Sequence, residues 1–261
     1  MSMYQSVQAL QQGAEHLLFD LADYDSLAET IYVPIAVVEA QTLAHHYPLV
    51  WRRAGETFEL VALLSISAPH YLMWRQELKL GLPHPLLIEA YPLCAAFNAE
   101  GAERGAVLFD AVAPVEGAKG TPVFKADRTI SSAAAQRLNA LQVYASDLAR
   151  TQAFTKALAG QGLLLDWPVR LLVGSDGVEL DGFCVLDPAA AARKTLSVLV
   201  ADHGFSIAEL ATFHDLSLFN MQRLVDRHRS ERLLAQAGRA ETARAQTAPT
   251  LGQTTDGAPI L

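Results

Sequence analysis

The chain has 261 residues, of which 51% are hydrophobic and 18% charged, a composition typical of a folded globular protein. Its formal net charge of −8 argues against nucleic acid as a general partner, because phosphate binding depends on clustered lysines and arginines. Two cysteines are too few for a disulfide framework. The longest uncharged run, residues 60–74, falls short of the roughly 20 apolar residues that a membrane helix needs.

Composition divides the chain into three parts. Residues 1–29 are expected to form a peripheral N-terminal arm with some helical character, and 30–230 a single domain. Residues 231–261 are rich in Ala, Thr, Gln and Gly and poor in large apolar groups, so we expect a disordered tail. The N-terminus shows no basic segment followed by an apolar stretch, which predicts a cytoplasmic location.

The first half of the domain is expected to contain a helix and two β-hairpins. Helical spacing of apolar residues predicts a helix within 36–46. Residues 47–64 and 91–109 both run Tyr-Pro-Leu, apolar strand, glycine-containing turn and apolar strand, which predicts a hairpin in each. The intervening residues 71–86 are expected to be an extended piece followed by a loop governed by Pro83 and Pro85.

A long helix and a third hairpin are expected in the second half. Residues 111–127 are rich in Pro, Gly and Lys and predict a surface connection. A long helix is expected next, with Ser131 or Ser132 as its N-cap and Gly160 or Gly162 as its C-terminal end. Residues 168–187 predict a hairpin around the turn 174–177. The expected fold is therefore α+β, with hairpins forming a mostly antiparallel sheet, one long central helix and a C-terminal helical pair.

The C-terminal helical pair has two interpretations. Ser206 and Glu209 have capping-box spacing, and Ser217 can cap a second helix, so two short helices are expected to meet at His214–Asp215. This pattern is typical of a helix-turn-helix motif. A DNA-binding version would direct the following residues at a major groove: Asn220, Gln222, Arg223 and Arg227. The balanced charge of the segment and the acidic chain favour two helices that close their own domain.

No catalytic pattern is present in the sequence. The eight histidines lack metal-ligand spacing, although His203 and His214, each next to an aspartate, could form a site if the fold joined them. Cys94 and Cys184 lie in apolar strands without positive neighbours, which predicts buried structural thiols. Phosphate-loop, nucleophile-elbow and dinucleotide motifs are lacking. We expect no cofactor and no metal, and leave enzymatic activity open.

Several blocks in order resemble the SapC-like family of bacterial proteins. They are VPI followed by HYPLV within 33–50, Tyr91-Pro92, the GxPxF of 120–124, residues 154–164, residues 180–187, and HDLSLFNMQRL at 214–224. The resemblance spans roughly residues 30–226, and residues 83–88 depart from the family pattern, which tends to be more aromatic and basic there. The family meant is the surface-layer-associated one, not the peptide-transporter permease that shares its name.

The resemblance implies an accessory role rather than a reaction. The family is linked by name to the surface layer of a pathogen, and many members belong to nutrient-uptake loci with halogenase-like and oxygenase-like proteins. We therefore expect a non-catalytic accessory or surface-associated protein that binds a partner protein or small ligand. An enzyme or enzyme component in such a locus, and a DNA-binding regulator, are the alternatives. The candidate ligand-binding residues are His214, Asn220, Arg223, Tyr47 and Tyr91.

Overall fold

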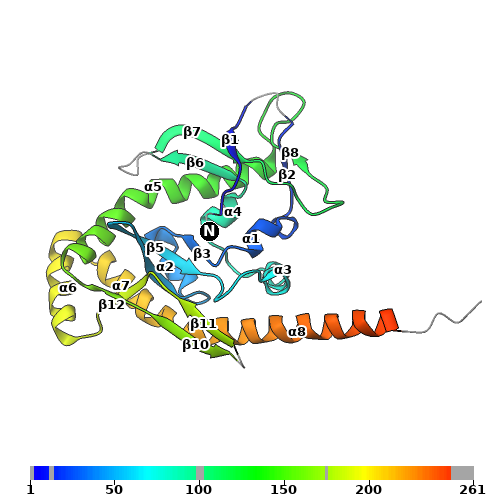
Figure 1. The fold of residues 1–261 in the computed structure, drawn as a ribbon. Coiled ribbons are helices and arrows are strands. Elements are labelled where there is room, and N and C mark those ends of the chain that lie inside the picture. The colour runs from blue at the N-terminus through cyan, green and yellow to red at the C-terminus, as the bar shows by residue number, and fades with distance from the viewer. Residues whose placement is uncertain (1–2, 12–14, 98–102, 174–175, 248–261) are drawn as a thin grey trace, which may run out of the picture.

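The computed structural model describes residues 3–11, 15–97, 103–173 and 176–247 (Figure 1). The α+β class is confirmed. Among the described residues the strands are divided between four antiparallel sheets instead of one. The long helix α5 (Ser132–Gly160) lies at the centre, and its Ser131 cap accepts a hydrogen bond from the amide of Ala134, as the sequence predicted.

The largest sheet has five strands in the order β3-β5-β4-β12-β9. Strands β4 (Leu49–Ala54) and β5 (Thr57–Leu63) form the first predicted hairpin, and β3 (Tyr32–Pro34) extends it. On the other side, β12 (Phe183–Leu186) pairs with β4 and with β9 (Leu164–Asp166). The hairpin residues Trp51, Leu60 and Ala62 belong to the main apolar core, whose burial stabilises the domain.

The second predicted hairpin lies in a separate three-stranded sheet. Strands β6 (Leu93–Phe97) and β7 (Glu103–Asp110) pair with each other, and β1 (Val7–Ala9) adds to β7. A short pair joins β2 (Leu17–Leu18) to β8 (Thr121–Pro122) within the predicted surface connection. The turn between β6 and β7, 98–102, lies outside the described residues.

The N-terminal arm is part of the core, which corrects the expectation of a peripheral segment. Besides supplying β1 and β2, it forms a 3-10 turn η1 (Leu21–Asp23) and helix α1 (Asp25–Ala28). Tyr24 and Leu27 are buried. The carboxylate of the fully buried Asp110 accepts hydrogen bonds from the amides of Gln5 and Ser6, which fixes the arm to β7.

Residues 71–86 are mainly helical, so the expectation of an extended piece is wrong. Helix α3 (Tyr71–Leu80) ends at Gly81, whose φ of 64° favours glycine, and α4 (Leu86–Ala90) follows Pro85. The prolines fall between the two helices, where they limit the loop without preventing a helix before it. The predicted helix within 36–46 is confirmed as α2 (Val37–Leu43).

The third hairpin differs from its prediction at one point. Strands β10 (Val169–Val173) and β11 (Asp176–Leu180) pair as expected, and their turn, 174–175, lies outside the described residues. The second strand does not continue to residue 187. At Gly182, with φ of 80°, the chain turns and β12 joins the five-stranded sheet.

The C-terminal helices begin and end elsewhere than expected. Helix α6 (Ala190–His203) precedes α7 (Ser206–Ser217), a 3-10 turn η2 (Leu218–Asn220) and α8 (Met221–Thr247). Ser206 lies inside α7 and makes no side-chain cap, while Ser217 ends α7 rather than starting α8. The helices therefore meet at residues 218–220, not at His214–Asp215. Residues 231–247, expected to be disordered, continue α8, and 248–261 lie outside the described residues.

Candidate functional site

Two side chains of α7 stand between strands β4 and β12. Pairing of these strands includes Cys184 with Trp51, and two residues further on the same register would place Leu186 opposite Leu49. Instead, Nδ1 of His214 donates to the Leu49 carbonyl at 2.6 Å, and Nε2 accepts from the Leu186 amide at 3.2 Å. The imidazole thus replaces a direct backbone bond at the point where the strands separate.

Ser217 completes this replacement on the same strand. Its hydroxyl accepts a hydrogen bond from the Leu49 amide at 2.8 Å and donates to the His214 carbonyl at 2.7 Å. His214 and Ser217 are both fully buried. Burial lowers the pKa of His214, which fits the neutral tautomer that these hydrogen bonds require.

Asn220 and Arg223 bind the C-terminal end of α2. The Asn220 side-chain amide donates to the Ala44 carbonyl at 2.7 Å, and Arg223 donates to the His45 carbonyl at 3.2 Å. Carbonyls at a helix C-terminus lack intrahelical partners, so these side chains satisfy them from another element. Asn220 is buried, whereas Arg223 is exposed.

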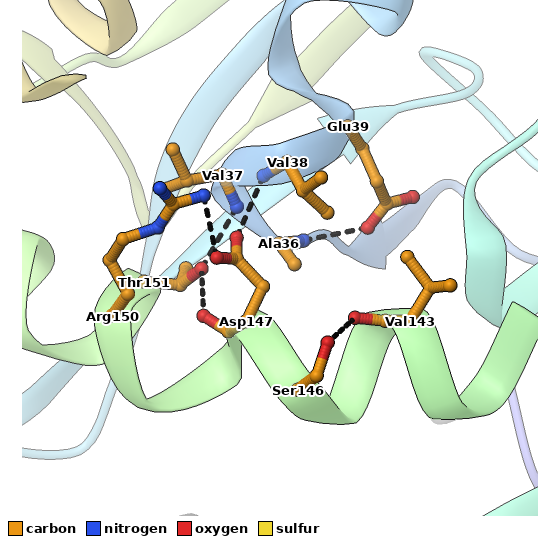
Figure 2. A network of polar contacts seen from close by, with 9 residues as sticks. All are labelled: Ala36, Val37, Val38, Glu39, Val143, Ser146, Asp147, Arg150 and Thr151. Carbon is orange, nitrogen blue, oxygen red and sulfur yellow. Dashed lines mark hydrogen bonds and ion pairs between the residues drawn. The ribbon is translucent and has the colours of Figure 1, made fainter.

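The N-terminal end of α2 is satisfied by α5, as Figure 2 shows. The Asp147 carboxylate accepts from the Val38 amide at 2.7 Å, and the Thr151 hydroxyl accepts from the Val37 amide at 2.9 Å. The Glu39 carboxylate accepts from the amides of Ala36 and Leu86 at 2.7 and 2.6 Å. Helix α2 is therefore capped at both ends by side chains, including several from distant parts of the sequence.

Glu39 is the carboxylate most affected by its surroundings. Burial raises its pKa to about 7, although its two backbone N–H donors favour the charged form. The buried carboxylates of Glu39 and Asp110 thus have the same role, because each accepts hydrogen bonds from two backbone amides.

The predicted residues Tyr47 and Tyr91 lie in different parts of the core. Tyr47 is buried just after α2, with its hydroxyl 3.4 Å from Nδ1 of His84. Tyr91 is buried near the N-terminal arm, and its hydroxyl donates to Asp110 at 3.0 Å. The structure therefore gathers four of the five predicted residues around the segment 44–49 and separates Tyr91 from them. A ligand-binding role for any of them stays a prediction.

Two concave regions are lined by other residues. A narrow cleft of about 320 Å³, measured to its open mouth, lies at the base of α8, where Ser67 is hydrogen bonded to Nδ1 of His228 at 2.8 Å. A shallow open depression of about 890 Å³ lies beside α5 and includes Arg137, which already donates to the carbonyls of Tyr91 and Phe19. In the described part of the chain, neither concave region includes a residue of the predicted set.

The outer face of α7 and η2 is apolar and exposed. Phe205, Leu216 and Phe219 have 80%, 54% and 83% of their surface exposed. Together with Thr212 they follow spacings of seven, four and three residues, which places them on one side of a helix, opposite His214. We call Phe205, Thr212, Leu216 and Phe219 the α7–η2 surface.

Sequence reasoning missed this surface and the side chains of α5 that cap α2. Asp147, Thr151 and Thr155 are buried polar residues at intervals of four inside the apolar stripe of α5, and this interruption was a usable signal. Thr155 accepts a hydrogen bond from the Trp51 indole at 3.2 Å. The surface was hidden because the helix break had been placed at residues 214–215.

Two negative findings apply to the described residues only. They contain no group of three or more His, Cys, Asp or Glu side chains arranged to hold a metal ion. His203 packs edge-on against Phe154, with ring centroids 5.8 Å apart, and His214 is occupied by backbone groups. Within the same ranges, no helix is both long and apolar enough to cross a membrane.

The DNA-binding alternative loses one of the four side chains that it would direct at a major groove. Asn220 is buried and donates to the Ala44 carbonyl, so it cannot reach a base. Arg223 is exposed but directed to His45.

Comparison with known proteins agrees with the sequence resemblance. The SapC family model matches residues 16–224, which is most of the chain and includes α2, the five-stranded sheet, α7 and η2. No curated protein and no solved structure matches the chain. The chain belongs to the SapC family.

Proposed function

We propose that this protein is a non-catalytic binding component that docks a partner protein through the α7–η2 surface. The observation that carries this proposal is the exposure of Phe205 and Phe219 on one helical face. Aromatic residues are enriched among the side chains that dominate binding energy at interfaces. Full burial of one such side chain contributes roughly 1.5–3 kcal/mol.

The surface is supported by a rigid inner face. His214 and Ser217, on the opposite side of α7, are bonded to backbone atoms of β4 and β12. A surface held in this way loses little conformational entropy on binding, which favours affinity. The same polar residues are occupied within the fold, so partner binding is assigned to the apolar face.

Charge indicates what kind of partner fits. Residues 195–222 contain no lysine or arginine, and Glu209 lies on the exposed side of α7 between Phe205 and Thr212. Asp215 is also exposed. An apolar surface bordered by carboxylates favours an amphipathic helix with basic residues beside its apolar face. A component of this kind would suit a nutrient-uptake locus, in the cytoplasm or at the cell surface.

The test uses two designed amphipathic helices that differ only in the charge beside the apolar face. The basic helix is expected to bind roughly tenfold more tightly than the acidic one, which corresponds to about 1.4 kcal/mol. The double variant F205D/F219D should lose this binding, whereas L172D, at an 82% exposed residue of β10, should retain it. Equal binding of the two helices, or unchanged binding by F205D/F219D, would contradict the proposal.

A further inference from the structure

We propose that the end of α8 from a second copy of this chain occupies the α7–η2 surface, giving head-to-tail association. This inference rests on the proposed function, because it names an occupant for the same surface. It starts from the distal part of α8, which projects from the rest of the protein as a single helix (Figure 1). Leu233 and Leu234 on this helix are 66% and 51% exposed.

The distal part of α8, residues 229–247, has the chemistry that the surface favours. Residues 229–247 contain four arginines (229, 232, 239 and 244) and two glutamates (231 and 241), so the segment is basic in an otherwise acidic chain. The adjacent exposed residues Leu233 and Leu234, which directly follow Arg232 in the sequence, provide an apolar contact. The α7–η2 surface offers phenylalanines next to carboxylates, so the two regions are complementary in both polarity and charge.

The two regions of one molecule cannot meet. Helix α8 begins at Met221, directly after η2, and runs continuously to Thr247. At 1.5 Å per residue, its far end lies roughly 40 Å from its start. Figure 1 shows this end pointing away from α7. A helix that leaves the surface in this way can reach the same surface only on another molecule.

A free helix of this type also needs a partner for its stability. Isolated helices in water are marginal, because most helical stability in proteins comes from packing of an apolar face. Docking Leu233 and Leu234 would supply that packing. The contact joins two different surfaces, so it is heterologous, and a dimer still offers a free α7–η2 surface on one copy and a free α8 on the other. Association should therefore continue beyond a dimer as concentration rises.

The experiment measures mass in solution by sedimentation and light scattering of the full chain. The wild type is expected to form concentration-dependent oligomers that weaken as salt is raised, because salt screens the charged pairs. L233D/L234D and F205D/F219D should each be monomeric. L172D changes an exposed apolar residue outside both surfaces and should associate like the wild type.

Mixing the two monomeric variants gives the decisive result. F205D/F219D retains an intact α8, and L233D/L234D retains an intact α7–η2 surface, so an equal mixture should form one-to-one dimers and nothing larger. Failure of the mixture to associate, or oligomers that persist in either variant alone, would overturn head-to-tail docking. Binding of the basic designed helix to monomeric L233D/L234D would then still support the proposed function. Loss of that binding as well would reject both.

Discussion

The two faces of α7 differ in the polarity and burial of their side chains. The inner face carries His214 and Ser217, polar side chains that are fully buried and bonded to three backbone groups of β4 and β12. The outer face, continued by the N-cap of α7 and by η2, carries Phe205 and Phe219, apolar side chains that are 80% and 83% exposed. This reverses the usual inside-outside distribution. It teaches that His214 and Ser217 serve the fold, whereas the two exposed phenylalanines lie outside the core and are the residues to which our proposal assigns binding.

The largest test of this comparison is H214A. Removing the imidazole leaves the Leu49 carbonyl and the Leu186 amide buried without this partner, and each such group costs about 1–3 kcal/mol. We expect a loss of about 3–5 kcal/mol in the free energy of unfolding, measured by chemical denaturation. A loss below about 1 kcal/mol would mean that water or a direct strand bond replaces the ring.

A second test follows the pH dependence of stability. Burial lowers the pKa of His84 from 6.5 to about 4, so the unfolded chain binds a proton in this range that the folded chain does not. The stability that neutral His84 contributes is present above pH 6.5. It is lost as pH falls towards 4, and the free energy of unfolding falls by at most about 3 kcal/mol. H84F should reduce this pH dependence, measured by urea unfolding between pH 4 and 7.

Glu39 acts in the opposite direction over a similar range, and this provides a control. Its pKa is raised from 4.5 to about 7, so its folded form gains stability as pH falls from 7 towards 4.5. E39Q should remove this gain, so the free energy of unfolding should fall more steeply on acidification in E39Q than in the wild type. An outer-face variant, F219S, should leave the pH dependence unchanged. If H84F did not reduce the acid loss, His84 would not be a cause of it.

A third test compares two side chains at the same helix end. N220A removes a buried donor from the Ala44 carbonyl and should cost about 1–2 kcal/mol. R223A removes an exposed donor from the His45 carbonyl, where water can replace it, and should cost about 0.5 kcal/mol. Thermal unfolding of both variants would check this order. The reverse order would indicate that Arg223 makes the more important contact.

The smallest effect is expected on the outer face. F205S and F219S remove side chains that are 80% and 83% exposed, so the free energy of unfolding should change by no more than about 0.5 kcal/mol. Both should weaken binding of the basic designed helix. A clear loss of stability without loss of binding would show that this face is structural after all.

Local patterns predicted those elements whose signals are local. The Ser131 cap and the hairpin at 47–64 were recoverable because a cap and a Gly turn are encoded within a few residues. Helix α3 was missed because the residues before Pro83 and Pro85 were expected to be extended, although the prolines act only after Gly81. The contact between His214 and Leu49 joins residues 165 apart in sequence, and no local rule predicts it.

The family block illustrates the same limit. The sequence singled out Asn220 and Arg223 as candidate ligand-binding residues. It could not show that both donate to carbonyls at the end of α2, or that Asp147 and Thr151 satisfy the other end. The exposed face of α7 became visible only with the correct helix boundaries, since one helical face is defined by spacing within one continuous element.

The contacts of His214 and Ser217 with β4 also determine when the sheet can be completed during synthesis of the chain. Strand β4 is made early, yet the Leu49 amide and carbonyl obtain their partners only after residue 217 has been added. Until then the sheet retains an incomplete strand edge, and such edges readily pair with other chains. A chain truncated before α7 would therefore be prone to aggregation. Synthesis of the full chain protects the first hairpin from pairing with other chains.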